Sequence, residues 1–504
     1  MDQFFRRRPG ASGKVRDRRQ RSVVAEKGIS SPATGLRRSC RLILALVLAS
    51  GHCAAAAVDS EVFIKNVPHV KQKTDFCGEA CVEMVLRKLG FPMSQDHVFN
   101  CSGLDPVAGH GCCTADLARA MKKIGFDPGA VWYPVDAKNT ASGIEKQWKA
   151  MHADLASGIP SIVCTRFDES PSTTEHFRLV LGYDPKTDEV IYHDPALDDG
   201  SNLRMKRARL LGLWQLKGPG TRVTAIRLRC LPAGIVKAAA PVGFTPADYV
   251  QHVMALRQGA AGKGYHIMIE PPFVVLGDEE AGVVRERARQ TVKWAVDKLK
   301  QDYFTKDPDT IIDIWLFKDK ESYEKNTVRI FHEKPTTPYG FYSDRDNALI
   351  MNIATGGGTL VHEIVHPFVR ANFPGCPAWF NEGLGSLYEQ SSSRDGHIVG
   401  LTNWRLAGLK QEIANGTLPS FAALLGSTEH EFYSSKRGNN YAQARYLCYY
   451  LQENGLLVKF YREFLANRSS DPTGIETLKR VLDEKDPAAF QKKWEKEVMK
   501  LSFP

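Results

Sequence analysis

Apolar residues recur at two different spacings along the chain, one typical of helices and one typical of strands. In the stretch CGEACVEMVLRKLG, apolar side chains from Ala80 to Leu89 follow a helical period that ends at Gly90. The later stretches PSIVCTRF, HFRLVLGYD and EVIYHDPA are apolar runs separated by turn residues, which predicts strands. The first half of the chain therefore combines short helices with strands.

The second half shows the same mixture with longer helices. The stretches HIMIEPPFVVLGD, TIIDIWLFKD and NALIMNIA predict strands, and residues 279–300 predict an amphipathic helix. Further helices are predicted at 403–415, 440–453, 456–467 and 484–500. A region rich in Pro, Gly and Ala separates the halves. We therefore predict an α+β protein with a domain at 60–232, a linker at 233–248 and a second domain at 249–504.

The positive charge of the chain is concentrated in its first residues. Residues 1–41 hold twelve Lys and Arg but only three Asp and Glu, which accounts for +9 of the formal net charge of +10. The remainder is therefore close to neutral, so the overall charge gives no support for nucleic-acid binding.

This basic tail leads into RLILALVLASGHCAAAAVDS, which has the layout of a secretory signal peptide. The apolar run is shorter than the ~20 residues that a membrane-spanning helix needs. We predict that residues 1–57 are removed near Ala57, that the protein is exported to the periplasm or the medium, and that no stable membrane span remains. Lipidation of Cys53 is disfavoured because His52 stands where a small residue is expected. A translation start further downstream remains open because the basic region is unusually long.

Nine of the eleven cysteines follow the predicted signal peptide. In an exported protein this odd number suits one reactive thiol and up to four disulfides. If Cys77 is the reactive thiol and Cys376 pairs with Cys448, the six remaining cysteines allow 15 disulfide connectivities. The alternative is that most of them are buried free thiols, which small apolar cysteine side chains tolerate.

Three residues of the first half have the chemistry of a cysteine nucleophile and its base. Cys77 directly precedes the helical run, where the helix dipole favours a thiolate. His176 and Asp194 lie on two later strands, where neighbouring strands can bring a base and its orienting group together.

The sequence around these residues resembles the papain-like cysteine peptidases that trim bacteriocin leaders. VPHVKQKTDFCGEACVEMVLRKLG, EHFRLVLGYD and IYHDP carry the resemblance, which covers roughly 65–200. The resemblance implies that Gln72, five positions before Cys77, supports the oxyanion hole. Glu79 departs from the family, which has proline there, and an acid beside Cys77 raises the thiol pKa. A disulfide between Cys77 and Cys81 and a non-catalytic peptide-binding unit are the alternatives.

The second half contains TLVHEIVHPF at 359–368, in which two histidines stand four residues apart. On a helix His362 and His366 share a face and can bind one zinc ion, while Glu363 takes the proton of a metal-bound water. Glu382, in PAWFNEGLGSLYEQ, lies sixteen residues later and offers a third ligand on a second helix. Pro367 predicts a kink or an early end of the first helix, at a cost of about 3 kcal/mol.

HEIVH together with WFNEGL resembles the gluzincin metallopeptidases over about 270–455. The resemblance implies that NALIMNIATGGG is an edge strand that holds the substrate backbone. It also implies an oxyanion-stabilising tyrosine on a later helix, for which Tyr441 is our candidate and Tyr446 its rival. Gly383 and Gly385, which weaken a helix, indicate close backbone packing.

These observations together predict an exported two-domain peptidase. The predicted cofactor is Zn²⁺, and the predicted partner is a peptide or protein substrate rather than a nucleic acid. The alternatives are a catalytically weak protein that binds peptide or cell-wall material, and a cysteine unit that acts alone beside a structural zinc. The sequence sets neither the cleavage preference nor the oligomeric state.

Overall fold

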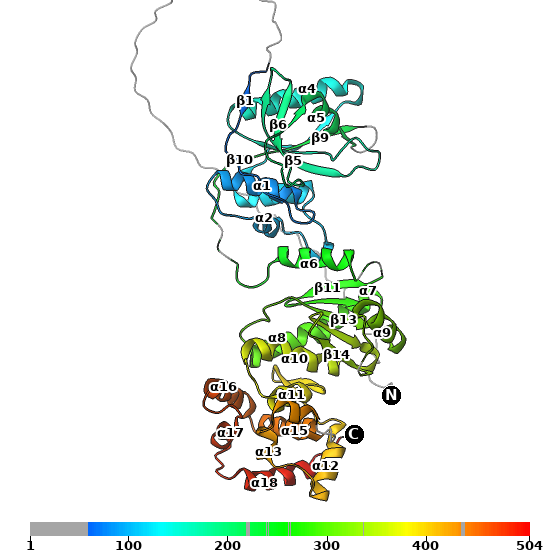
Figure 1. Ribbon diagram of the computed structural model, residues 1–504, viewed down its shortest axis with the longest axis vertical. Coiled ribbons are helices and arrows are strands. Elements are labelled where there is room, and N and C mark those ends of the chain that lie inside the picture. The colour runs from blue at the N-terminus through cyan, green and yellow to red at the C-terminus, as the bar shows by residue number, and fades with distance from the viewer. Residues whose placement is uncertain are drawn as a thin grey trace, which may run out of the picture. The chain divides into compact units, whose positions relative to one another are not determined.

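The computed structural model describes residues 59–217, 222–237, 239, 241–260, 262, 264–335, 337–434 and 439–503. The predicted signal peptide and its cleavage site lie outside these residues. The described chain mixes helices and sheets, which confirms the predicted α+β character (Figure 1). The exact domain boundaries stay predictions.

The first half is built around an antiparallel sheet in the order β3–β9–β4–β5–β6–β7. Its strands are β3 Val131–Val135, β4 Ser161–Arg166, β5 Glu175–Asp184, β6 Glu189–His193, β7 Leu203–Lys206 and β9 Val223–Arg229. Two short strands extend it, β1 Val62–Phe63 on β5 and β8 Leu216–Lys217 on β9. The three predicted strand segments correspond to β4, β5 and β6.

Helices cover both faces of this sheet. On one face lie α1 Cys77–Lys88, α2 Gln95–Ser102 and α3 Thr114–Ile124, whose apolar side chains form one core with Ile162 and Leu179. On the other face α4 Thr140–Ala156 and α5 Arg207–Leu213 pack against Val163 and Val180. Because successive residues of a strand point to opposite faces, adjacent residues such as Ile162 and Val163 enter different cores.

Helix α6, Pro246–Gln258, begins inside the predicted linker. Thr245 caps it through a capping box with Asp248, which fixes its start. Its Val250 packs into the core with α1 to α3, while Val253 packs into a core of the second half. The helix therefore buries two different faces.

The second half contains a five-stranded sheet in the order β11–β12–β13–β15–β14. The strands are β11 His266–Glu270, β12 Phe273–Gly277, β13 Ile312–Phe317, β14 Gly340–Ser343 and β15 Ala348–Asn352. The three inner strands β12, β13 and β15 run parallel, and each outer strand is antiparallel to its neighbour. Inner strands that are apolar on both faces suit a parallel sheet with helices on both sides.

The segment NALIMN forms a strand as predicted, but the predicted position of this strand at the edge of the sheet is wrong. The segment NALIMN forms β15, which lies inside the sheet between β13 and β14. The turn at 344–347 folds the chain back, so the preceding strand β14 covers the outer side of β15. The edge of the sheet on this side is therefore β14.

The predicted helix at 279–300 is a continuous helical segment with three parts. These are α7 Ala281–Arg287, the π-helical η3 Ala288–Lys293 and α8 Trp294–Asp302. The helix predicted around HEIVH is α10 Gly358–Asn372, and α11 Ala378–Leu387 follows it. Pro367 lies inside α10, which continues for five more residues, so the predicted early end is wrong.

The remaining predicted helices are also present. They are α12 Arg405–Asn415, α15 Asn439–Glu453, α16 Leu457–Asn467 and α18 Pro487–Lys500. Sequence patterns did not indicate α9 Lys320–Asn326, α13 Phe421–Leu425, α14 Glu429–Ser434, α17 Ile475–Leu482 or the hairpin of β16 Ser391–Arg394 and β17 His397–Gly400. These elements are short, so little periodicity marks them.

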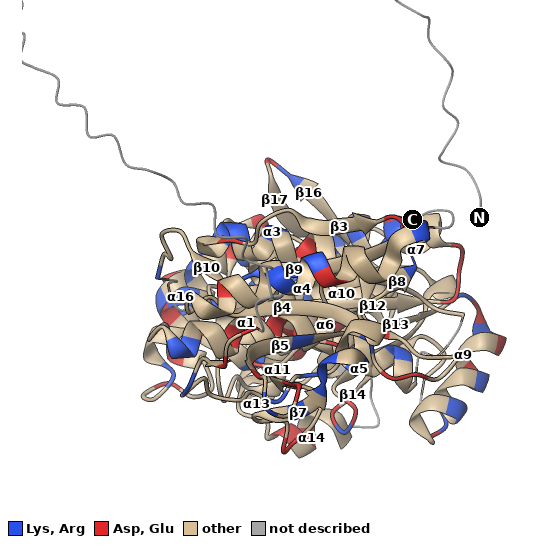
Figure 2. Cartoon of the chain, turned by 90° about the horizontal axis from the view of Figure 1, so that it is seen from above, with Lys and Arg blue, Asp and Glu red and all other residues tan. Residues whose placement is uncertain are grey.

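Two surface properties bear on the predicted partners. Basic and acidic positions are interspersed along the described helices and loops (Figure 2). None of the helices in the described residues combines the length and the apolar character that a membrane crossing needs.

All nine described cysteines are free thiols, and most are buried or half-buried. The disulfide interpretation is therefore wrong for these residues, and the buried-thiol alternative holds. Cys77 does not pair with Cys81, and Cys376 does not pair with Cys448.

Candidate functional site

Two of the candidate metal ligands project from one side of α10. Leu360, Ile364 and Phe368 recur every four residues and are fully buried in the core of the second half. This apolar stripe fixes the rotation of the helix about its axis. As a result His362 and His366 turn together toward α11.

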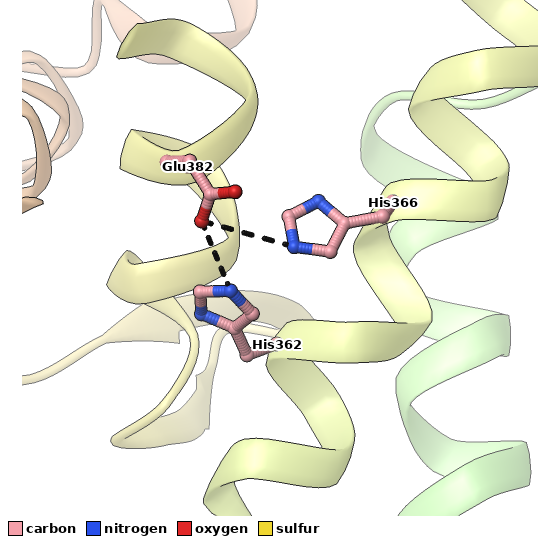
Figure 3. A group of neighbouring side chains, drawn as sticks. All are labelled: His362, His366 and Glu382. Atoms are coloured by element: carbon pink, nitrogen blue, oxygen red, sulfur yellow. Dashed lines mark ion pairs between the residues drawn. The ribbon is translucent and has the colours of Figure 1, made fainter. Parts of the chain in front are cut away.

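Glu382 on α11 reaches between the two histidines (Figure 3). Its Oε2 lies 3.2 Å from Nε2 of His362 and 3.8 Å from Nε2 of His366. The ligand atoms of the three residues all lie within 4.8 Å of one another. Tetrahedral zinc with bonds of about 2.0–2.1 Å separates its ligand atoms by roughly 3.3 Å. The three side chains therefore have the chemistry and the spacing of a zinc site.

Electrostatics also indicate a site for a cation. Oε2 of Glu382 is a buried oxygen without a hydrogen-bond partner of good geometry. Burial opposes ionisation of Glu382, but its contacts with His362 and His366 lower its pKa to about 2. Burial likewise opposes protonation of His362, but Glu382 and Glu389 raise its pKa to about 10. A metal ion bound between Nε2 of His362 and Oε2 of Glu382 would satisfy both groups.

A second layer of side chains orients the histidines. Nδ1 of His366 lies 3.0 Å from Oδ1 of Asn381, and Nδ1 of His362 lies 3.3 Å from Oε1 of Glu389. An Nδ1–H of His366 that donates to Asn381 leaves Nε2 of that ring free to bind a metal, whereas the contact of His362 with Glu389 is an ion pair without hydrogen-bond geometry. Arg405 clamps Glu389 with two hydrogen bonds of 2.7 and 3.0 Å.

The two glycines of the NEGLGS segment allow this close approach. A Cβ on Gly385 would lie 3.2 Å from His366 and 3.3 Å from His362, so only glycine leaves room for both rings. A Cβ on Gly383 would lie 3.0 Å from the sulfur of Cys448 on α15. The predicted close packing at both glycines is confirmed.

A cleft of about 870 Å³ opens beside the cluster. Its lining includes His362, Glu363, Glu389, Arg405, Tyr441 and residues 339–340 at the start of β14. Glu363 is half-buried and makes no hydrogen bond or ion pair in the described part of the chain, which leaves its carboxylate available. The volume is in the range of small-molecule and peptide sites.

The two candidate tyrosines have different environments. Tyr441 lines the cleft with its ring 5.3 Å from the Arg405 guanidinium, and burial raises the pKa of its hydroxyl. Tyr446 is fully buried, and its hydroxyl is hydrogen-bonded to the backbone of Asn403. Tyr441 is therefore the one of the two that substrate can reach.

Sequence reasoning missed Tyr433, whose hydroxyl donates a 2.7 Å hydrogen bond to Oε1 of Glu382. It also missed Glu389 and Arg405, which no motif marks. Asn381 could have been predicted from the sequence, because it directly precedes Glu382 in the NEGL segment.

In the first half the structure joins two of the three predicted catalytic residues. Nε2 of His176 on β5 lies 2.7 Å from Oδ1 of Asp194, which follows β6. Cys77 is the first residue of α1, as predicted, and its thiol contacts the backbone of Phe177, next to His176. The described contacts include no hydrogen bond between Cys77 and His176.

Gln72 lies just before α1, where its backbone N–H donates to the carbonyl of Pro195. Its side-chain Oε1 is buried and has no hydrogen-bond partner in the described residues. The loop that carries Asp194 is thus tied to the segment that precedes Cys77.

Arg178 completes this group and was not predicted. Its Nε donates to Oδ2 of Asp194 at 2.9 Å, and its guanidinium also donates to Thr165 and to the carbonyl of Phe167. Both Arg178 and Asp194 are almost fully buried. The contacts with His176 and Arg178 lower the pKa of Asp194 although burial opposes its ionisation.

The surroundings of Cys77 oppose a thiolate. Burial and then the nearby acids Glu79 and Asp75 raise its pKa to about 12. Glu79 is fully buried, its Oε1 accepts the Cys112 N–H at 2.7 Å, and its Oε2 has no partner. The expected effect of Glu79 on the thiol therefore has the predicted direction, although burial is the larger cause.

Comparison with known protein families gives a match in the first half of the chain. The sequence model of the Peptidase_C39 like family matches residues 64–219. The match includes Gln72, Cys77, His176 and Asp194, and it supports an N-terminal papain-like cysteine peptidase domain, hence hydrolase chemistry on a peptide or protein. No curated protein has significant sequence similarity to the chain.

Replacing Glu79 by Gln is expected to remove a pH-dependent loss of stability. Burial raises the pKa of Glu79 from 4.5 to about 7, so the unfolded chain ionises at lower pH than the folded one. Stability is therefore lost between pH 4.5 and about 7, by roughly 3 kcal/mol at 1.36 kcal/mol per pKa unit. Urea unfolding of wild type and variant across this range measures the difference.

The matched control is Glu169→Gln, because Glu169 is exposed and its pKa is lowered by Arg209. This control should keep the wild-type fall in stability. A Glu79→Gln protein that lost stability with pH as steeply as wild type would contradict the prediction.

Proposed function

We propose that the chain is an exported two-domain peptidase whose second half hydrolyses peptide bonds with a bound zinc ion. The observation that carries this proposal is the juxtaposition of His362, His366 and Glu382 beside a cleft that Glu363 also lines. Export rests on the sequence of residues 1–57 alone.

In this proposal the zinc ion is held by His362, His366 and Glu382. When bound, zinc supplies a Lewis acid and lowers the pKa of a coordinated water toward 7. Glu363 adjoins His362 in sequence but is not one of the three ligands, and its carboxylate lines the cleft without a counter-ion. It is therefore placed to take the proton of the attacking water and to pass it to the leaving amine.

The remaining cleft residues suit a peptide. Strand β14 is the edge of the sheet, and residues 339–340 at its start line the cleft, so an extended substrate backbone can pair along this edge. Tyr441 is proposed to donate its hydroxyl proton to the oxyanion that forms at the scissile carbonyl. Arg405 keeps Glu389 against His362 and also lines the cleft.

The cysteine unit is proposed to use Cys77 as nucleophile, His176 as base and Asp194 as the group that orients the base. Gln72 would supply the oxyanion hole. Because the pKa of Cys77 is raised to about 12, this unit needs His176 to remove the thiol proton during the reaction rather than beforehand.

The same raised pKa favours a second candidate function, a catalytically weak protein that binds peptide or cell-wall material. Metal analysis of the purified full chain separates the two. The peptidase proposal predicts about one zinc per chain, because without a cation the three clustered ligands leave the buried Oε2 of Glu382 without a hydrogen-bond partner. A chain that is folded and substantially free of zinc would favour the binding function.

A further inference from the structure

A second cavity, of about 520 Å³, lies in the zinc-peptidase half and is separate from the cleft. We name it the basic pocket. It is bounded by the end of α8 and the following loop, the end of α10, and α16; its lining includes Lys300, Lys306, Asn372, Tyr461, Arg462 and Arg468.

The basic pocket and the cleft lie toward opposite ends of α10. The cleft is lined by residues 358–363 of this helix, whereas the basic pocket is lined by Ala371 and Asn372. Glu363 and Ala371 are eight positions apart on the helix, or about 12 Å at 1.5 Å per residue. A ligand of the basic pocket would therefore not occupy the zinc site.

The charge on the pocket wall is strongly positive. Lys306, Arg462 and Arg468 line the pocket and are exposed, and none of the three has an ion-pair partner in the described part of the chain. Lys300 is also in the wall but is paired with Asp307 at 2.6 Å. Three positive charges that line one cavity and have no ion-pair partners repel one another, so a bound anion would lower this electrostatic repulsion.

The acidic residue of the pocket wall, Asp302, already has hydrogen-bond partners. Oδ1 of Asp302 lies 2.5 Å from Nδ1 of His397, and Oδ2 accepts the backbone N–H of Ile398 at 3.1 Å. Asp302 thus bonds to His397 and Ile398, and it forms no ion pair with Lys306, Arg462 or Arg468 in the described residues. One acid against four basic residues leaves the wall with a net positive charge.

The pocket also contains an unused polar group. Tyr461 is only 2% exposed and lines the cavity, and its hydroxyl has no hydrogen bond in the described residues. Because Tyr461 lines the cavity, this hydroxyl is available to donate a hydrogen bond to a ligand oxygen.

The wall that faces Tyr461 is rigid. Oδ1 of Asn372 accepts the backbone N–H groups of Thr305 and Lys306, both at 2.9 Å, and its Nδ2 donates to the carbonyls of Lys306 and Phe368. Because the end of a helix carries partial negative charge, α10 would oppose an anion. The bonds from Asn372 to Phe368 and from the Phe373 N–H to Val369 already occupy two of its last carbonyls, which weakens this opposition.

We propose that the basic pocket binds the oxyanion group of a small ligand, a phosphate or a carboxylate. Arg462, Arg468 and Lys306 would contact the oxyanion, and the Tyr461 hydroxyl would donate a hydrogen bond. The volume is larger than a single ion needs, which fits an organic phosphate or a polycarboxylate.

Titration calorimetry of the full chain with inorganic phosphate and with citrate tests the proposal and separates the two sources of the oxyanion. Saturable binding of either probe at one site per chain supports it. Because a hydrogen bond to a charged group contributes about 1.5–3 kcal/mol, Arg462→Gln or Arg468→Gln should weaken binding roughly tenfold or more.

Lys459→Gln is the matched control, because Lys459 lies on the same helix and loses the same charge but does not line the pocket. It should bind the probe as wild type does. An equal loss in this control would show general electrostatic attraction, and no saturable binding up to ~10 mM would also overturn the proposal. Binding that is lost in His362→Ala but kept in the arginine variants would place the anion at the zinc site instead.

Discussion

Replacing Glu363 by Gln is expected to leave zinc bound and to remove most peptide hydrolysis. Gln has the same shape but cannot take the proton of the attacking water, and general base catalysis contributes about 10²–10⁴-fold to such a reaction. Because Glu363 is not one of the three clustered ligands and makes no hydrogen bond or ion pair in the described part of the chain, the fold should be unaffected. The measurement is kcat/KM on a peptide library together with the zinc content of both proteins.

Cys77→Ala is the companion variant in the same assay. If the second half carries the activity, Cys77→Ala should hydrolyse the same peptides at the wild-type rate. Normal hydrolysis by Glu363→Gln, with loss in Cys77→Ala, would instead assign catalysis to the cysteine unit and leave zinc a structural role.

The second large effect is expected for Glu382→Ala, which should lose both zinc and hydrolysis. This change removes the oxygen that lies 3.2 Å from His362 and 3.8 Å from His366, so two neutral ligands remain and no negative charge faces the metal. Zinc affinity, measured by competition with a chelator, should fall by more than the 10–100-fold that is typical of outer contacts.

Glu389→Gln provides the comparison for this variant. Glu389 contacts Nδ1 of His362 rather than the metal-facing nitrogen, so its loss should weaken zinc binding by about 10–100-fold. If Glu382→Ala bound zinc as tightly as Glu389→Gln, Glu382 would not be the third ligand.

The grouping of the three candidate metal ligands could be predicted from the sequence because their positions follow from local rules. A spacing of four residues places His362 and His366 on one helix face, and NEGL marks a second helix that brings Glu382 back. The outer residues could not be predicted in this way. Glu389 and Arg405 meet His362 only through the packing of segments that follow α11, and no spacing rule relates them.

The edge strand and Pro367 show where local reasoning misled. The pattern of NALIMN is that of a buried strand, and its place in the sheet depends on a turn that brings β14 to its outer side. Pro367 lacks an N–H and was expected to kink α10 or to end it early. Residues beyond it, including Phe368 and Val369, are buried in the core, and this burial keeps the helix intact.

In the first half the sequence predicted the pairing of His176 with Asp194 and the direction of the Glu79 effect on the Cys77 pKa, but not the burial of these groups. His176 and Asp194 are joined as expected from neighbouring strands. The pairing of Asp194 with Arg178 is a long-range feature of the folded sheet, and Arg178 was read only as part of a strand. The burial of Glu79 was equally hidden, because an acid in an amphipathic helix is normally expected on its exposed face.

Hydrolysis of a peptide library by the full chain, before and after removal of the metal, tests zinc-dependent catalysis most directly. We predict that a chelator abolishes hydrolysis of the peptides that the second half cleaves, that added zinc restores it, and that alkylation of thiols leaves cleavage of these peptides unchanged. Hydrolysis that persists in the chelator and disappears on alkylation of Cys77 would contradict the proposed function.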